Sequence, residues 1–196
     1  PGHYIDNNFD LAGFSVGCVD EKKILNDKNV KVGNILIGIE SSGPHSNGFS
    51  LIRKIINDSQ SPKTLKEDMV KQVLKPTILY PNLIMSLIKD FKVNSISHIT
   101  GGGLLENLPR SIPNNLSIEI DETSWEMPKI FQWLKEEGNL SNNEMYRIFN
   151  CGIGMALFVE KDDSSKIMNK ILQMGHKCFQ IGVVSEKKDN DSIKFF

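Results

Sequence analysis

Two glycine-rich turns, each between an apolar run and a helical pattern, constrain this chain more than any other feature. The first is SSGPHSNG, residues 41–48, which follows GNILIGIE and precedes FSLIRKII. The second is TGGG, residues 100–103, which follows VNSISHI and precedes LLENL. Strands that pass into helices through such turns are typical of proteins in which helices cover a β-sheet.

The remaining periodicity extends this pattern along the whole chain. Alternating or continuous apolar runs predict strands within 9–25, 29–41, 93–100, 116–122, 152–160, 178–187 and 192–196. Helical spacing predicts helices within 46–58, 68–74, 77–91, 101–112, 126–138, 142–150 and 163–175. Asp162 to Ser164 are cap candidates for the last of these helices, and residues 57–68 are expected to form a polar loop. We therefore expect an α/β (α+β) fold, a mixed β-sheet of about six strands covered by helices, as a single domain over residues 1–196.

Composition excludes several functional classes. The formal net charge is −1, which gives no general attraction to nucleic acid or to an anionic membrane. The three cysteines, Cys18, Cys151 and Cys178, form no CxxC pair, which indicates a reducing compartment and argues against a zinc or disulfide framework. No apolar run approaches the roughly 18 residues of a membrane span. We expect a cytoplasmic protein whose own side chains bind no metal.

Both glycine turns are candidate sites for a phosphate or carboxylate group. A helix N-terminus exposes unpaired N–H groups, and glycine lets an anion approach them closely. Ser46 or Asn47 is expected to cap the following helix, with a hydroxyl or amide that can also donate to phosphate. The alternative is that both turns are only caps and tight turns. His45 is either an exposed loop histidine or a group that holds a proton or a ligand oxygen.

Other polar residues have a structural interpretation beside a functional one. Asn150, in the turn FNCG, is expected to adopt an unusual backbone angle or to contact ligand. Cys151 is expected to be a packed thiol and not a nucleophile. Asp121 and Glu122 follow a strand, where ligand groups are common, so each is either a metal ligand or ribose-hydroxyl acceptor or, as we expect by default, part of a solvated turn. His98 is expected to be a hydrogen-bonded core histidine.

Six ordered segments resemble one known family. They are DLAGFSVG, SSGPHSNGFSLIRKI, HITGGGLLENLPRSIP, DETSW, EMYRIFNCGIGMALFV and QIGVV. Together they resemble the C-terminal portion of the phosphoribosylformylglycinamidine cyclo-ligase (AIR synthetase) family. The resemblance implies a ligase of purine biosynthesis that uses ATP, with Mg²⁺, to cyclise formylglycinamidine ribonucleotide to 5-aminoimidazole ribonucleotide. It also implies a homodimer.

The resemblance further implies that residues 1–25 are a lead-in strand from an N-terminal domain that holds most of the ATP and Mg²⁺, so that this chain alone is inactive. By motif position it implies a catalytic role for His45. It also implies substrate or phosphate contacts for Ser42, Gly43, Ser46, Asn47, Gly48, Thr100, Gly101, Gly102, Gly103 and Asn150. Two alternatives are another ATP-dependent enzyme of the same superfamily and a ligand-binding domain without catalysis.

Overall fold

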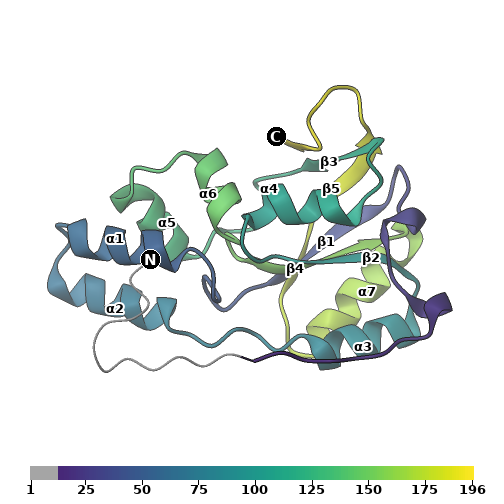
Figure 1. Cartoon of the computed structure of the whole chain (residues 1–196), viewed down its shortest axis with the longest axis horizontal. Helices are drawn as coiled ribbons and strands as arrows, with labels where there is room; N and C mark the ends of the chain where they lie inside the picture. The colour runs from purple at the N-terminus through teal and green to yellow at the C-terminus, as the bar shows by residue number, and fades with distance from the viewer. Residues whose placement is uncertain (1–12) are drawn as a thin grey trace.

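The computed structural model describes residues 13–196 and contains one six-stranded sheet with helices around it (Figure 1). The strands are β1 (Ile35–Glu40), β2 (Val93–His98), β3 (Leu116–Ile120), β4 (Ile153–Val159), β5 (Cys178–Glu186) and β6 (Ile193–Phe195). The helices are α1 (Phe49–Asp58), α2 (Lys63–Val73), α3 (Pro81–Asp90), α4 (Gly103–Asn107), α5 (Lys129–Glu137), α6 (Asn142–Ile148) and α7 (Lys161–Gln173). Three short 3-10 helices are η1 (Glu21–Lys23), η2 (Asp27–Asn29) and η3 (Leu108–Ser111). The predicted mixed sheet is confirmed.

Strand directions bring several chain segments to one edge of the sheet. The spatial order is β2-β4-β1-β5-β3-β6, and β4 runs antiparallel to both β1 and β2. Strands β1 and β2 therefore run in the same direction, and both end at the edge where β4 begins. Only the β3–β6 pair is parallel among neighbouring strands of the described residues.

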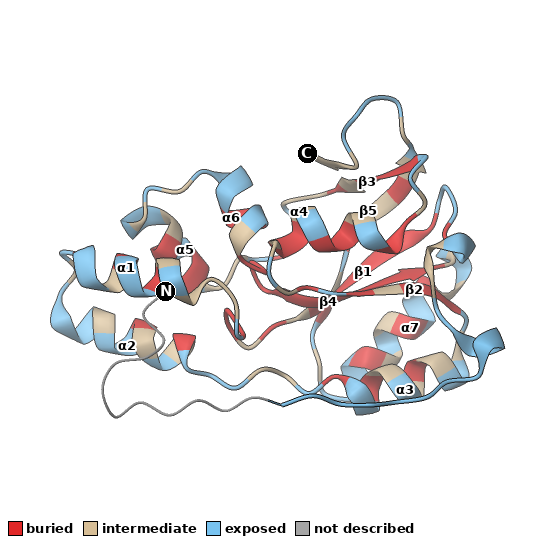
Figure 2. Ribbon diagram, viewed as in Figure 1, coloured by how far each residue is buried: buried red, intermediate tan, exposed pale blue. Residues whose placement is uncertain are grey.

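The sheet is buried on both faces. Figure 1 shows α3 and α7 along one face, α4 on the other, and α1, α2, α5 and α6 grouped at one end. Because side chains alternate along a strand, Leu36 and Ile37 of β1 enter two different apolar clusters. Burial is accordingly concentrated in the central strands (Figure 2). Among the helices of residues 13–196, none is long and apolar enough to cross a membrane.

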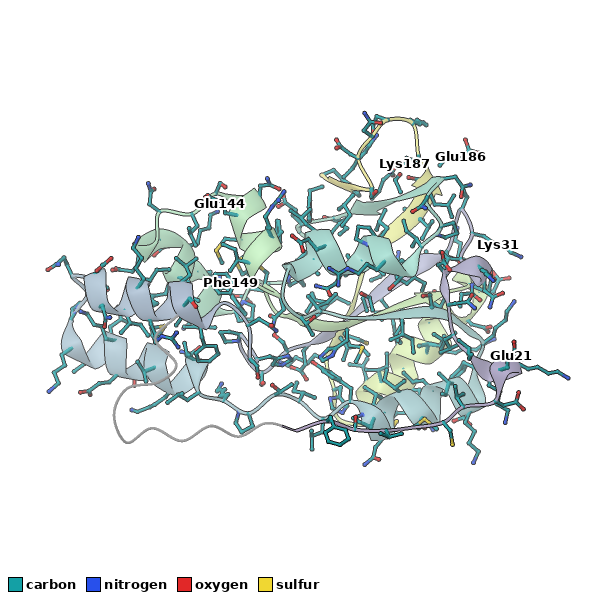
Figure 3. The ribbon with its side chains drawn as sticks, in the orientation of Figure 1. Glu21, Lys31, Glu144, Phe149, Glu186 and Lys187 are labelled. Carbon is teal, nitrogen blue, oxygen red and sulfur yellow. The ribbon has the colours of Figure 1, made fainter. Side chains whose placement is uncertain are left out.

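The helical end of the molecule has an aromatic interior, whereas charged side chains lie at the opposite end. Figure 3 shows Glu21, Lys31 and Lys187 at the far end from Phe149. Phe149 is fully buried and packs on Phe131, with ring centroids 6.0 Å apart. The α1, α2, α5 and α6 group therefore has an apolar interior of its own, continuous with one face of the sheet.

The strand predicted within 9–25 is wrong over its described part. Residues 9–12 lie outside the described residues, and residues 13–20 form no strand. Phe14 is 95% exposed and Val16 is 89% exposed. A strand is stable only when a neighbour accepts its backbone hydrogen bonds, and no strand of the described chain lies beside this segment.

Three helix starts also differ from prediction. Helix α1 begins at Phe49, three residues after the predicted Ser46. Helix α2 begins at Lys63, which shortens the predicted polar loop, because the charged residues after Pro62 are good helix formers. Helix α7 is capped at Glu160 without a side-chain hydrogen bond, so the predicted caps Asp162 to Ser164 are wrong. Helix α3 begins at Pro81, inside the predicted range 77–91, and proline is well accommodated in a first helical turn.

Candidate functional site

Three turns meet where β1 and β2 end and β4 begins: the first is residues 41–48, the second is residues 100–103, and the third is FNCG, residues 149–152. The backbone N–H of Ser41 donates to the carbonyl of Gly152 at 2.8 Å, and that of Ile99 donates to Gly154 at 3.0 Å. The two glycine turns also approach each other, because a Cβ on Gly101 would lie 3.7 Å from Oδ1 of Asn47. Turns separated by more than fifty residues in sequence thus form one polar edge, as sheet topology requires.

The first turn, residues 41–48, leads into α1 through left-handed backbone. Gly48 has φ 75° and is the N-cap, and no side-chain hydrogen bond caps the helix. The prediction that Ser46 or Asn47 caps α1 is therefore wrong. A Cβ on Gly48 would lie 2.4 Å from the ring of Phe149, so only glycine fits. Ser46 is exposed and Asn47 half-buried, which leaves both available to a ligand.

His45 lies inside the turn and not on its surface. It is only 5% exposed, has φ 57°, and its Nε2 accepts a hydrogen bond from the backbone N–H of Ser42 at 3.3 Å. Its Nδ1 is buried and has no partner among the described residues. Burial, with a smaller contribution from His98, lowers the pKa of His45 to about 4. The interpretation of His45 as an exposed loop histidine is therefore wrong, and its imidazole is neutral at pH 7.

Tyr80 is a component of this edge that sequence reasoning missed. Its hydroxyl donates to the carbonyl of Glu40 at 2.7 Å, and its ring lies 6.2 Å from that of His45 and 6.1 Å from that of His98. Burial and the nearby Glu40 raise the pKa of the Tyr80 phenol. His98 is exposed, so its predicted place in the core is wrong. No short-range spacing in the sequence links Tyr80 to His45.

The second turn is held by Asn107, another residue that the sequence did not indicate. The Asn107 amide donates to the carbonyls of Thr100, Gly101 and Gly103 at 3.4, 3.1 and 2.8 Å. Its Oδ1 accepts from the hydroxyl of Thr100 at 3.2 Å. Gly102 has φ 92° and is the N-cap of α4. A single side chain therefore holds the shape of the turn through hydrogen bonds to three of its four residues.

Gly103 in this turn cannot be any other residue. It has φ 55°, and a Cβ there would lie 2.2 Å from the carbonyl oxygen of Tyr146 and 2.7 Å from that of Phe149. The contact partners are backbone atoms, which cannot move aside as a flexible side chain does. The third glycine of TGGG thus permits close packing of α4 on α6, while the first two remain nearer the surface.

Asn150 joins the first and third turns. Its Oδ1 accepts from the Ser41 hydroxyl and from the N–H of Gly152, each at 2.9 Å, and its Nδ2 donates to the carbonyl of Gly43 at 2.9 Å. The positive φ angles belong to Cys151 (49°) and Gly152 (102°), so the predicted unusual angle at Asn150 is wrong. The Asn150 side chain is buried and bonded within the protein. Ser42 is likewise engaged, because its hydroxyl donates to the carbonyl of Pro76 at 2.6 Å.

The remaining sequence candidates are structural. Cys151 is fully buried, and burial raises the pKa of its thiol, which confirms a packed and unreactive cysteine. The Asp121 carboxylate accepts hydrogen bonds from the N–H and hydroxyl of Thr123, which lower its pKa. Trp125 donates its indole N–H to the carbonyl of Cys151 at 3.0 Å and is buried. Within residues 13–196, no group of three or more His, Cys, Asp or Glu side chains is arranged to hold a metal ion.

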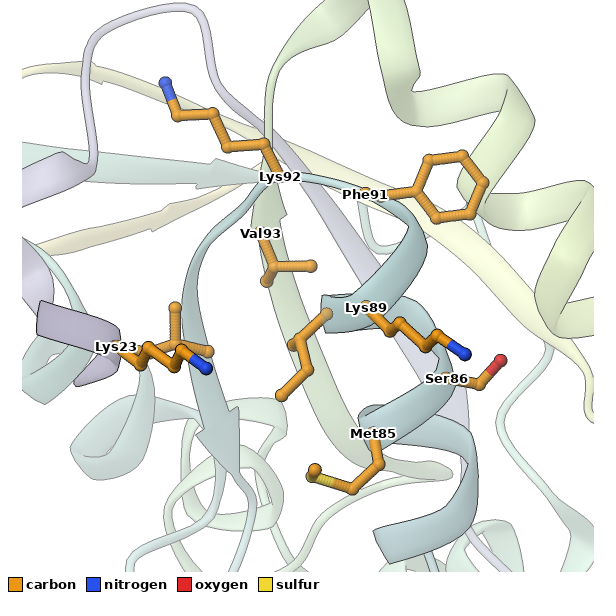
Figure 4. Close-up of a pocket in the computed structure, with 9 residues that line it drawn as sticks. Lys23, Met85, Ser86, Lys89, Phe91, Lys92 and Val93 are labelled. Atoms are coloured by element: carbon orange, nitrogen blue, oxygen red, sulfur yellow. The ribbon is translucent and has the colours of Figure 1, made fainter. Parts of the chain in front are cut away.

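Of two pockets, one adjoins the polar edge and the other lies away from it. A pocket of about 380 Å³ shares Tyr80 and His98 with the polar edge; the rest of its lining is Thr77, Ile78, Leu79, Pro81, Ile84 and Met155. A pocket of about 830 Å³ lies at the start of β2, between α3 and the segment after η1, and Lys23 reaches toward it (Figure 4). Val93 lines this second pocket and is the first residue of β2, whereas His98 is the last. The larger pocket therefore lies at the opposite edge of the sheet from the glycine turns.

The mixed sheet with glycine-rich turns gathered at one edge defines a class of α/β domains. A solved structure of thiamine-monophosphate kinase from Stenotrophomonas maltophilia shares this fold, with a TM-score of 0.59 and 14% identity, over 90% of this chain and 54% of that one. Residues 31–194 match the family described as AIR synthase related protein, C-terminal domain. The chain belongs to this family, as the resemblance of its motifs implied.

Two curated relatives carry one name. A phosphoribosylformylglycinamidine cyclo-ligase from Citrifermentans bemidjiense is 44% identical over 193 residues, which cover 95% of this chain and 55% of the relative. A protein of the same name from Trichlorobacter lovleyi is 45% identical over 202 residues, covering 98% and 57%. The chain thus spans little more than half the length of these relatives.

Proposed function

We propose that this chain forms part of an ATP-dependent carbon–nitrogen ligase of purine biosynthesis, which closes the imidazole ring of 5-aminoimidazole ribonucleotide from formylglycinamidine ribonucleotide. The single observation that carries the proposal is the 44% identity to a phosphoribosylformylglycinamidine cyclo-ligase across 95% of the chain. The polar edge supports it, since two glycine turns there present neutral donors to an anion. A different ATP-dependent enzyme of this fold is less well supported, because the kinase that shares the fold is only 14% identical.

The chain contributes one wall of the active site. The turns 41–48 and 100–103 receive a phosphate of the ribonucleotide or of ATP, through backbone N–H groups and the side chains of Ser46 and Asn47. His45 contacts the substrate, while Asn150 and Ser42 hold the first turn in shape. In this proposal no positive side chain is needed, because an anion is bound by several oriented dipoles.

ATP and Mg²⁺ accompany the reaction, and both bind mainly to the part of the protein that corresponds to the rest of the relatives' length. The donor set of residues 13–196 does not fit a Mg²⁺ site, which needs carboxylate oxygens close together. No step is therefore assigned to a metal on this chain. The complete enzyme is a cytoplasmic homodimer, and the chain alone is folded but does not turn over substrate.

Calorimetric titration of this chain with formylglycinamidine ribonucleotide, and separately with ATP–Mg²⁺, tests the proposal. Gly102→Val fills the second turn, because even a Cβ there would lie 2.5 Å from the Glu106 carboxylate. Gly175→Val is the matched control: Gly175 also has positive φ, 85°, but no atom lies within 4 Å of its Cβ position. We expect ribonucleotide binding that Gly102→Val and His45→Ala weaken and Gly175→Val does not. If all three variants bind as tightly as the unaltered chain, the polar edge is not the binding site. The alternative, a binding domain without catalysis, predicts in addition that the complete protein does not close the imidazole ring.

A further inference from the structure

We propose that His45 acts as a neutral hydrogen-bond donor, through Nδ1–H, to an oxygen of the bound ligand, and that Tyr80 is the residue that positions it. The identity of the ligand rests on the function proposed above. The state of His45 is a property of this chain alone and is argued from its contacts.

The hydrogen bond to Ser42 sets the tautomer of His45. Nε2 accepts from the backbone N–H of Ser42 at 3.3 Å, so Nε2 carries a lone pair and no proton. In a neutral imidazole the other nitrogen then carries the proton. His45 therefore presents Nδ1–H, and it does so from a turn in which its backbone is left-handed, φ 57°, and its side chain is buried.

The Nδ1–H donor has no partner in the described chain. The atom is buried, and His45 as a whole is 5% exposed. Buried donors are almost always hydrogen-bonded, and a native exception indicates an atom or group that the chain itself does not supply. An oxygen acceptor of a ligand at the polar edge satisfies this requirement.

Tyr80 and Gly154 hold the imidazole in place. The Tyr80 hydroxyl is anchored on the Glu40 carbonyl at 2.7 Å, and its ring is tilted by 58° against the His45 ring. A Cβ on Gly154 would lie 2.0 Å from the Tyr80 hydroxyl oxygen and 2.7 Å from Cε1 of His45. The two side chains thus share the space that the absent Gly154 side chain leaves on β4.

The charged groups around this cluster favour a neutral His45. His98, at the end of β2, disfavours a second positive charge when it is itself protonated. The carboxylate of Glu40, at the end of β1, accepts a hydrogen bond from the backbone N–H of Lys177 at 2.8 Å. Tyr80, which directly precedes α3, donates its hydroxyl to the backbone carbonyl of Glu40. None of these groups forms an ion pair with His45, so protonation of the ring gains no partner and loses hydration.

Nitrogen-15 NMR of this chain tests the assignment without any ligand. We expect the Nδ1–H tautomer at pH 7 and no titration of His45 between pH 5 and 8. Tyr80→Leu removes the anchored phenol, and we expect a mixture of tautomers and titration closer to pH 6.5. Tyr146→Phe, which alters a stacked tyrosine in the other apolar cluster, is the control and leaves the His45 signals unchanged. An Nε2–H tautomer, or titration near 6.5 in the unaltered chain, overturns the proposal.

Substitution at position 45 tests the donor in binding. His45→Asn and His45→Gly both tolerate a positive φ, but only asparagine places an N–H donor near the Nδ1 position. For formylglycinamidine ribonucleotide we expect His45→Asn to bind within about threefold of the original chain and His45→Gly about tenfold more weakly, as for the loss of one hydrogen bond. Equal loss in both variants overturns the donor role. If the ribonucleotide does not bind at all, the proposed function fails for this chain, while the NMR result still decides the tautomer.

Discussion

Gly154→Ala is the substitution whose effect follows most directly from the structure. Gly154 lies in β4, and its Cβ position is 2.0 Å from the hydroxyl oxygen of Tyr80 and 2.7 Å from Cε1 of His45. Its φ angle is not positive, so any cost comes from lack of space and not from the backbone. Gly38→Ala in the adjacent β1 is a matched control, because its Cβ would meet only side-chain carbons of Ile153 and Ile181, at 3.0 Å or more.

The magnitude is the balance of three effects. Overpacking a filled interior costs about 1–3 kcal/mol. Displacing Tyr80 also breaks its hydrogen bond to Glu40, which costs about 1 kcal/mol. Replacing glycine by alanine returns about 0.4–1 kcal/mol by restricting the unfolded chain. The unfolding free energy should therefore fall by about 1–3.5 kcal/mol for Gly154→Ala, and by less than about 1 kcal/mol for Gly38→Ala.

Urea unfolding followed by tryptophan fluorescence measures both values, with unchanged m-values as the criterion for comparing midpoints. A double-mutant cycle with Tyr80→Phe then identifies the cause, because phenylalanine lacks the atom nearest the new methyl group. We expect the cost of Gly154→Ala to fall by about 1 kcal/mol or more in the Tyr80→Phe background. Equal costs for Gly154→Ala and Gly38→Ala, or no coupling to Tyr80, would refute the reasoning.

Three further outcomes follow from the polar edge. Asn107→Ala removes the side-chain donor that three turn carbonyls share, although the Thr100 carbonyl keeps the N–H of Gly103, so we expect a loss of about 1–3 kcal/mol and faster amide exchange at residues 100–103. The exposed Asn143→Ala should change neither. Asn150→Ala unties the first and third turns, and amide exchange should accelerate in residues 41–45 and 151–153 while that of α7 stays unchanged; slow exchange in both turns would contradict this. The folded pKa of His45, about 4, lies below its unfolded value near 6.5, so the unfolded chain binds more protons between them and stability declines as pH falls from 6.5 to 4. His45→Asn should remove that part of the pH slope in urea midpoints, and an unchanged slope would place the titration elsewhere.

The order and type of most elements could be predicted from the sequence, because their signals are local. Five of the strands in the sheet and helix α3 with its N-terminal proline coincide with the expected segments. Local signals were insufficient where a neighbour decides the outcome. Residues 13–20 alternate as a strand does, yet they have no strand beside them and remain irregular. The sixth strand, β6, also matched, but its three residues depend on β3 for their hydrogen bonds.

The candidate site likewise combines features that local sequence predicts with features that depend on tertiary contacts. The sequence by itself determined that glycine turns 41–48 and 100–103 lie between strands and helices, because backbone conformations with positive φ require residues such as glycine. Only the tertiary structure decided which side chains hold these turns: Asn107 for the second, Asn150 for the first, and Tyr80 for His45. Asn107 lies only four to seven residues from the turn it holds, but its role depends on the fold of that turn. Asn150 and Tyr80 come from distant segments, and strand order, which no local pattern encodes, brings them to their partners. The same packing removes water from the imidazole of His45, and this makes it neutral.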